Sequence, residues 1–223
     1  IFDLNMPNLH KLFPVVFFVL FSVLTAQDST HSIRNGNWNQ ISTWDNGVPG
    51  PSKSAIIISP HTVTIPTAET ALMLNLRIDS GGTLNAESYY VTLEVFGDWL
   101  NNGTFDFTPF TDNLVKFRGT EDQEVRPGGD GFEYIELNNT GSGSGNKIKI
   151  KGNIDISQNL TFTKGTLDLT DGGNPTVDIG GNVTILNGAV WTKGNGTVTF
   201  DGSSQTFDDQ NGSPNNIGNI VVE

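Results

Sequence analysis

The fold is decided by the stretch Thr92-Leu93-Glu94-Val95-Phe96-Gly97-Asp98-Trp99-Leu100-Asn101-Asn102-Gly103-Thr104-Phe105. Apolar residues alternate with polar residues in its first part, which is the pattern of a short β-strand with one buried face. Gly97 and the pair Asn102-Gly103 interrupt the pattern with residues that favour tight turns. The stretch therefore predicts short strands that are separated by sharp corners.

The same stretch belongs to an internal repeat with a period of about 84 residues. Residues 92–98 align with 176–182, and residues 102–105 align with 187–190. Flanking segments keep the offset within about one residue: 76–78 with 160–162, 82–84 with 165–167, 115–119 with 198–202, and 135–137 with 220–222. Changes in loop length produce drift of this size, so we expect one architecture in both copies.

Short apolar or alternating runs follow one another along the rest of the chain. They cover residues 55–58, 62–65, 74–78, 90–96, 114–117, 134–137, 148–156, 160–162, 176–179, 183–185, 197–200 and 217–222. Between them stand Asn-Gly and Asp-Gly pairs, which adopt left-handed turn conformations without steric cost. Strong runs return about 20 residues apart, as from Val95 to Val115 and from Val115 to Ile135. This spacing favours the coils of a parallel β-helix.

We therefore predict an all-β fold, a right-handed parallel β-helix (solenoid) built from two repeats that each hold about four coils. The predicted organisation is a signal peptide with upstream residues at 1–26, an entry segment and cap at 27–54, and a solenoid at 55–223. Its repeats cover about 74–157 and 158–223; the second is truncated, so we expect more coils or a capping module after Glu223. Two Greek-key β-sandwich domains are the alternative, because the repeat length also permits them.

The composition agrees with a turn-rich β protein. The 223 residues include no cysteine, 26 glycines and 10 prolines, and only 16% are charged. The formal net charge is −12, and a field of that sign repels phosphate backbones and anionic lipid head groups. We expect no nucleic-acid partner, and we expect an extracellular polysaccharide or another surface protein as the kind of partner.

The amino end has the pattern of a secretory signal peptide. Lys11 precedes an apolar run at residues 12–24, and Thr25-Ala26-Gln27 follows it. The run is shorter than the roughly 20 residues that a helix needs to span a bilayer. We expect cleavage near Ala26, no permanent membrane anchor in this chain, and a location that is secreted or at the cell surface.

A segment rich in asparagine, glycine and tryptophan follows: Asn35-Gly36-Asn37-Trp38-Asn39-Gln40-Ile41-Ser42-Thr43-Trp44-Asp45-Asn46-Gly47-Val48-Pro49. Together with residues 55–58 and 60–65, it resembles the opening of secreted β-solenoid surface proteins of the Bacteroidota type. It is also similar to the extracellular domain family named for its eight glycines, and residues 95–105 and 159–167 have the same character. The resemblance implies a large surface or secreted protein, often with a carboxy-terminal sorting domain for the type nine secretion system.

Three tryptophans are candidate ligand-binding residues. Trp38, Trp44 and Trp99 could stack on sugar rings, because aromatic faces pack against the C–H surfaces of carbohydrates. The alternative, which we favour, is that Trp38 and Trp44 cap the end of the solenoid and Trp99 covers a coil edge, since terminal repeats must shield exposed apolar side chains.

A row of lysines is the second candidate. Lys147, Lys149 and Lys151 alternate with Ile148 and Ile150, which places three cations on one face of a strand. Such a row could bind an anionic glycan, or it could be a solvated strand face that discourages edge pairing.

Asp168, Asp171 and Asp178 are the candidate metal ligands, because carboxylate oxygens are the groups that calcium prefers. Their spacing matches neither an EF-hand loop nor the glycine-rich calcium nonapeptide. No cofactor is therefore the first expectation, and calcium is the alternative.

No set of residues has the spacing of a known catalytic motif, so we assign no catalytic residue and leave enzymatic activity open, with a preference against it. The sequence favours a noncatalytic secreted or cell-surface protein, structural or adhesin-like, that forms a rigid β-solenoid. A carbohydrate-binding module is the alternative. A polysaccharide lyase or hydrolase fragment is the third hypothesis, and it rests on fold analogy alone.

Overall fold

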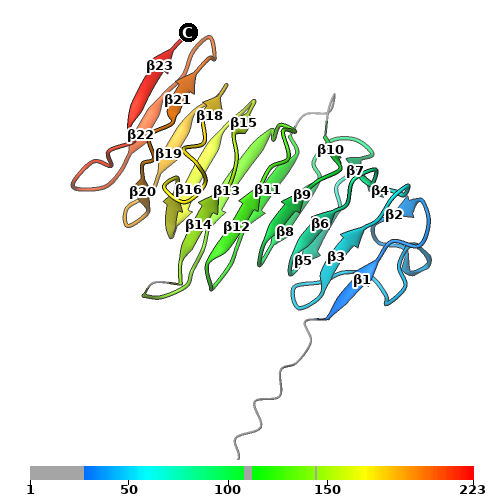
Figure 1. Ribbon diagram of the computed structural model, residues 1–223. Helices are drawn as coiled ribbons and strands as arrows, with labels where there is room; N and C mark the ends of the chain where they lie inside the picture. Colours follow the sequence, from blue (N-terminus) through cyan, green and yellow to red (C-terminus); the bar gives the residue numbers. More distant parts are fainter. Residues whose placement is uncertain (1–27, 108–111, 144) are drawn as a thin grey trace, which may run out of the picture.

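The protein is a stack of parallel β-strands wound into one long coil (Figure 1). The computed structural model describes residues 28–107, 112–143 and 145–223, and the predicted signal peptide lies outside them. Every pairing between named strands in this part of the chain is parallel. Its one helical element is the short 3-10 turn η1 (Ile41–Thr43).

The strands form three faces, which the chain visits in the order face 1, face 2, face 3. Face 1 is an eight-stranded sheet of β1 (Ser29–His31), β3 (Ser54–Ile57), β6 (Leu76–Ile78), β9 (Trp99–Asn101), β12 (Gln123–Arg126), β14 (Lys147–Ile150), β17 (Thr166–Asp168) and β20 (Val190–Thr192). Face 2 consists of two four-stranded sheets, the first of β2 (Gly36–Asn37), β4 (Thr62–Ile65), β7 (Thr83–Ala86) and β10 (Thr104–Asp106), the second of β15 (Ile154–Ile156), β18 (Val177–Ile179), β21 (Thr197–Phe200) and β23 (Asn219–Val222). Face 3 is a seven-stranded sheet of β5 (Thr70–Met73), β8 (Thr92–Val95), β11 (Leu114–Phe117), β13 (Tyr134–Asn138), β16 (Leu160–Lys164), β19 (Val183–Ile185) and β22 (Phe207–Asp209).

This topology confirms the predicted parallel β-helix. The alternative of two Greek-key sandwiches is wrong, because such domains are built from antiparallel strands. Successive strands of one face come from successive coils, so each strand pairs with segments about 20 to 25 residues away, as Val115 of β11 pairs with Ile135 of β13 and Ile135 with Leu160 of β16.

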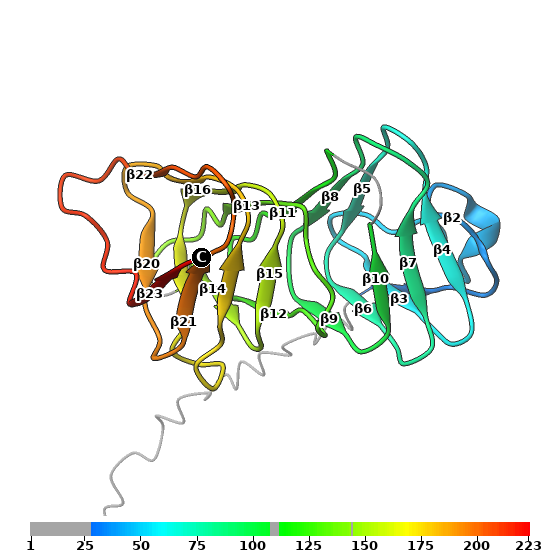
Figure 2. The ribbon, with the colours of Figure 1, turned by 90° about the horizontal axis from the view of Figure 1, so that it is seen from above.

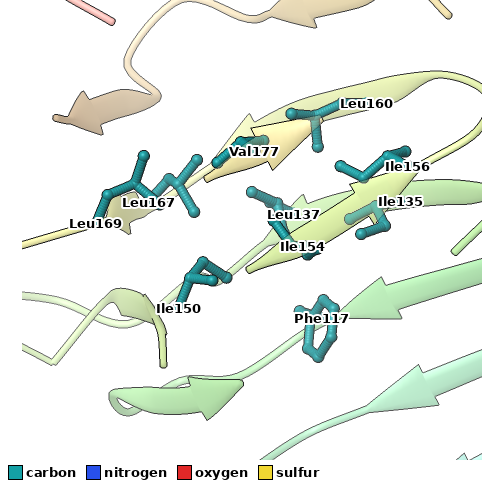
Figure 3. Close-up of a pocket in the computed structure, with 10 residues that line it drawn as sticks. All are labelled: Phe117, Ile135, Leu137, Ile150, Ile154, Ile156, Leu160, Leu167, Leu169 and Val177. Atoms are coloured by element: carbon teal, nitrogen blue, oxygen red, sulfur yellow. The ribbon is translucent and has the colours of Figure 1, made fainter. Parts of the chain in front are cut away.

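The core is made of rows of inward side chains that run along the solenoid axis. On face 3, Leu93, Val115, Ile135 and Leu160 occupy matching positions in four consecutive strands, and each is buried. Figure 3 shows this interior, with apolar side chains from all three faces turned toward one another. The void between them has a volume of only about 10 Å³, about the size of one water probe. The coils therefore close on a dry, tightly packed interior.

Two glutamines, the buried Gln123 and the half-buried Gln205, hold two of the corners between faces. The amide of Gln123 donates to the carbonyls of Val95 and Gly97 in the preceding coil, at 3.2 and 2.6 Å, and its oxygen accepts from the Gly119 N–H at 2.9 Å. Gln205 makes the equivalent three bonds, to Ile179, Gly181 and Gly202. Each glutamine thus satisfies backbone groups that a sharp corner leaves without strand partners.

Asparagine and aspartate side chains hold other corners in a ladder. The Asn75 side-chain carbonyl accepts from the Asp98 N–H at 2.7 Å, and the Asp98 carboxylate accepts from the Glu124 N–H at 2.8 Å. Asn159 and Asn182 form the same ladder one repeat later. A side chain from one coil therefore fixes the backbone of the next.

The 84-residue repeat does not return to the same face. Strand β6 on face 1 aligns with β16 on face 3, β7 on face 2 aligns with β17 on face 1, and β8 on face 3 aligns with β18 on face 2. The repeat thus spans three and two-thirds coils, close to the expected four, and each copy is turned by one face relative to the other. The glutamine and asparagine corners move with it: Asn75 lies before face 1, but Asn159 lies before face 3.

Strand prediction succeeded where runs were apolar and failed where they were polar. Residues 62–65, 114–117, 183–185 and 197–200 are strands with the predicted bounds. The predicted run 148–156 is two strands, β14 and β15, because a corner at residues 151–153 separates faces 1 and 2. Strands β7, β10 and β12 were missed because threonine, asparagine and charged residues fill their outward positions, and β9 was missed because it is only three residues long and has the polar Asn101 at an inward position.

The first coil is closed by the tryptophan-rich segment. Trp38 and Trp44 are buried, their rings meet edge to face at 5.2 Å, and the indole N–H of Trp44 donates to the Trp38 carbonyl at 2.8 Å. Gly36 is needed beside them, since a Cβ there would come within 2.5 Å of the Thr43 hydroxyl. The segment also supplies β2, and β1 lies just before it, so this part of the chain continues the sheets of faces 1 and 2 while covering their end.

Face 2 is interrupted in the middle of the molecule, as Figure 2 shows between β10 and β15. The coil that joins β12 to β13 has no strand on this face and contributes a single bridge between Phe132 and Ile156. In place of a neighbouring strand, the Asp130 carboxylate accepts from the Phe105 N–H at 2.7 Å and from the Asn101 amide at 2.9 Å. A carboxylate therefore closes the edge of β10.

Replacing a corner glutamine should destabilise the fold. Gln123→Ala is expected to lower the free energy of unfolding by about 1–3 kcal/mol, because it leaves buried carbonyl and N–H groups without partners. The exposed Gln210→Ala is the matched control and should change it by less than about 0.5 kcal/mol. Urea denaturation followed by circular dichroism measures both; equal effects would contradict the structural role of Gln123.

Candidate functional site

None of the three candidate tryptophans presents a ring to solvent. Trp38, Trp44 and Trp99 are 2%, 3% and 0% exposed. Trp99 points inward from face 1 and packs edge to face on Phe105 at 4.9 Å. The expectation that they stack on sugars is therefore not met, and Trp99 is a core residue instead of a cover for a coil edge. Sequence pattern could not separate these roles, since an indole suits a core and a binding surface equally.

The lysine row lies on the outer surface of face 1, as the alternation predicts. Ile148 and Ile150 point into the core, and the three lysines point outward. Each lysine is paired with a carboxylate from a neighbouring coil: Lys147 with Asp168 at 3.0 Å, Lys149 with Asp122 at 2.8 Å, and Lys151 with Asp171 at 2.7 Å. The row is thus a ladder of ion pairs between coils, and its charge is already compensated.

Asp168 is the most buried of these carboxylates, at 2% exposure. Burial alone would raise the pKa of Asp168. Three hydrogen bonds outweigh the effect of burial: one from the Thr170 hydroxyl at 2.6 Å, one from the Thr170 N–H at 2.9 Å, and one from the Lys147 ammonium at 3.0 Å, whose positive charge acts in the same direction. The net result is a lowered pKa, so Asp168 stays ionised. Its oxygens are engaged by the protein itself.

The candidate metal ligands do not converge. Asp168 and Asp171 pair with different lysines near face 1, whereas Asp178 lies on β18 of face 2. Within residues 28–107, 112–143 and 145–223, no three carboxylate or imidazole groups are arranged so that they could hold a metal ion. Calcium binding by these three residues therefore has no geometric support in the described part of the chain.

The three faces differ sharply in charge. Faces 1 and 3 carry ion pairs between coils, such as Lys116 with Glu136 at 3.1 Å and Arg118 with Glu94 at 2.7 Å on face 3. The strands of face 2 contain no lysine or arginine. Face 2 therefore carries an uncompensated part of the negative charge.

Two aspartates oppose one another directly on face 2. Asp155 of β15 and Asp178 of β18 occupy matching positions, with Asp201 nearby, and none of these carboxylates has a hydrogen bond or ion pair with another described residue. Partial burial first, and then the charges of Asp178 and Asp201, raise the pKa of Asp155. Like charges in register destabilise a sheet.

The break in face 2 opens into a cleft of about 400 Å³. Its floor is aromatic, from Phe105, Phe107 and Phe132, and its rim includes Glu133 and Asp155. Burial raises the pKa of Glu133, although the Asn113 N–H donates to its carboxylate at 2.9 Å. The cleft thus combines an apolar floor with carboxylates of raised pKa, which are features that binding and catalytic sites often share.

The sequence reasoning missed the two corner glutamines and the acidic pair. A signal for the glutamines was present, because Gln123 follows Gly119 and Gln205 follows Gly202 in aligned copies of the repeat. Asp178 was singled out only as a candidate metal ligand, and no local signal marked its pairing with Asp155, because the two residues lie 23 residues apart and meet only through the register of the coils.

In comparisons with known proteins, no family model, curated protein or solved structure matches the chain. The evidence on function is therefore the geometry described above. No helix in the described ranges has the length and apolar character to cross a membrane.

Two aspartate variants should have opposite effects on stability. Asp155→Asn is expected to raise the free energy of unfolding at pH 7 by roughly 0.2–1 kcal/mol, toward the lower end because the group is exposed and salt screens it. Asp168→Asn is expected to lower it by about 1–3 kcal/mol, since a buried ion pair loses one charge.

The pH dependence follows from the two pKa directions. A raised pKa makes the ionised Asp155 unfavourable, so the stabilisation by Asp155→Asn should shrink as the pH falls from neutral toward about 4, the ordinary aspartate value. A lowered pKa makes the ionised Asp168 favourable, so the destabilisation by Asp168→Asn should persist down to about pH 4 and shrink below it. Thermal unfolding of both variants and the parent between pH 3 and 8 measures this. A stabilised Asp168→Asn or a destabilised Asp155→Asn at pH 7 would contradict the assignment.

Proposed function

We propose that this chain is a noncatalytic structural module of a secreted or cell-surface protein, in which a rigid β-solenoid spaces or displays other parts of an extracellular assembly. The observation that carries the proposal is the unbroken stack of in-register strands on face 1, from β1 to β20. Each coil contacts its neighbours through side-chain rows, corner ladders and ion pairs. Such a body resists bending, and its length grows with the number of coils.

The proposed location is supported by the amino end of the sequence and by charge. The apolar run at residues 12–24 supports export, and the resemblance to secreted β-solenoid surface proteins agrees with it. A net charge of −12 supports solubility outside the cell. In an adhesin-like role, the protein would bind a partner along the length of the solenoid.

A distance measurement tests the rigidity that the proposed role needs. The chain has no cysteine, so Ile56→Cys on β3 and Thr192→Cys on β20 give two unique labelling sites on the outside of face 1. Six inter-strand steps separate these strands, which corresponds to about 29 Å. Pulsed electron paramagnetic resonance on spin labels at both sites should give one narrow distribution near 30 Å. A broad distribution would mean that the coils flex, and a rigid spacer would then be the wrong description.

Export can be tested separately. Expressed from residue 6 in a bacterium with an active secretory pathway, the chain should leave the cytoplasm and lose its first residues, so that Gln27 becomes the new amino terminus. Intact-mass measurement of the exported protein identifies the cleavage point. Ala26→Lys serves as the control that should block processing, and an uncleaved cytoplasmic product from the parent chain would refute secretion.

A further inference from the structure

A groove of about 280 Å³ lies on the outside of face 3, where β11, β13 and β16 are neighbours. It is separate from the cleft in face 2 and from the lysine ladder on face 1. Besides the aromatic ring of Tyr134 and the aliphatic Leu114, its lining includes four polar side chains: Asp112, Glu136, Asn159 and Thr161. The volume is just below the usual range for ligand pockets, so it suits a single compact unit.

The groove results from a step in side-chain length along face 3. In one outward row, the long residues Glu94, Lys116 and Glu136 are followed by the short residues Thr161 and Thr184. One carboxylate oxygen of Glu136 forms an ion pair with the Lys116 ammonium at 3.1 Å, and the other accepts a hydrogen bond from the Asn138 amide at 3.3 Å. The long residues therefore form a wall, and the threonines form a shelf beside it.

A second outward row ends at the same place. Leu114 of β11 and Tyr134 of β13 occupy matching positions, and Asn159 precedes β16 in the next coil. Tyr134 is half-buried, so part of its side chain remains accessible in the groove. The groove thus has an aromatic side, formed by Tyr134, and a polar side.

Three groups at the groove have unused hydrogen-bonding capacity. The hydroxyls of Tyr134 and Thr161 have no hydrogen-bond partner among the described residues. The side-chain carbonyl of Asn159 accepts from the Asn182 N–H at 2.8 Å, which leaves its amide N–H groups free to donate. These groups can exchange hydrogen bonds with a ligand that both donates and accepts.

The charges around the groove select against anions. Asp112 and Glu136 lie on its rim, and Lys116 is neutralised by Glu136. Burial, and then the negative charges of Asp112 and Glu133, raise the pKa of Tyr134, so its hydroxyl stays protonated and can donate. A uronate, sulfate or phosphate group would meet repulsion here.

We propose that this groove binds one sugar unit of a neutral glycan, with a C–H face of the sugar against the Tyr134 ring and its hydroxyls hydrogen-bonded to Tyr134, Asn159 and Thr161. Hydroxyl groups donate and accept at once, which matches the mixed set of unused groups. This site would let the rod hold a neutral polysaccharide in addition to spacing other modules.

Saturation-transfer NMR and titration calorimetry on residues 27–223 test the proposal. The probes are neutral hexasaccharides of β-1,4-glucose, β-1,4-xylose, β-1,4-mannose and α-1,4-glucose, with a hexamer of mannuronate as the anionic comparison. At least one neutral probe should bind, and the mannuronate should bind more weakly than it. Absence of binding by all neutral probes, or preference for the mannuronate, would overturn the proposal.

Variants locate the site. Tyr134→Phe keeps the ring and should weaken binding about 2- to 10-fold, the loss expected for one hydrogen bond, and Thr161→Val should do the same. Tyr134→Ala removes the ring as well and should weaken binding by more than about 10-fold. Tyr90→Phe, an exposed tyrosine at another corner, and Thr199→Val, an outward threonine on face 2, are the matched controls and should leave affinity unchanged. Unchanged binding by folded Tyr134→Phe and Thr161→Val together would place the ligand elsewhere and refute this site.

Discussion

The inward apolar side chains of the inner coils, such as Val115 and Ile135, are buried by the equivalent side chains of the coils above and below them, and the rest of the structure depends on this in-register stacking. A single coil could not bury its own inward residues, because three strands of three to five residues enclose too little volume. Stacking also fixes the outside: once Val115 lies over Ile135, Lys116 must lie over Glu136. The ion pairs, the acidic pair and the groove on face 3 are all consequences of one register.

The corners between faces impose a second requirement, which is that their backbone groups find hydrogen-bond partners. A chain that turns every few residues leaves backbone groups without strand partners, and buried groups of this kind are costly. Gln123, Gln205 and the asparagine ladder satisfy them with side chains that reach into the adjoining coil. These contacts couple neighbouring coils, so stiffness along the axis comes from polar corners as well as from the apolar interior.

Much of the fold could be predicted from sequence, because alternation and turn residues act locally. The alternation in residues 114–117 and 197–200 specifies strands wherever they lie in the coil. Alternation does not specify the face on which a strand lies. Each strand in the second copy of the repeat accordingly lies one face away from its counterpart in the first copy. The candidate sites were less predictable, since burial of Trp99 and the contrast between Asp168 and Asp155 depend on which residues the coil brings from about 20 residues away. The neutralised lysine row has the same cause: its carboxylates come from neighbouring coils.

Disulfide trapping tests the register most directly, because the chain has no cysteine of its own. Thr161 and Thr184 lie opposite one another in β16 and β19, at a separation that a disulfide can span. The double variant Thr161→Cys/Thr184→Cys should form an intramolecular disulfide on mild oxidation without loss of thermal stability. Thr161→Cys/Asp178→Cys, whose residues lie on different faces, should not. Efficient trapping of the second pair and failure of the first would contradict the stacked, in-register solenoid.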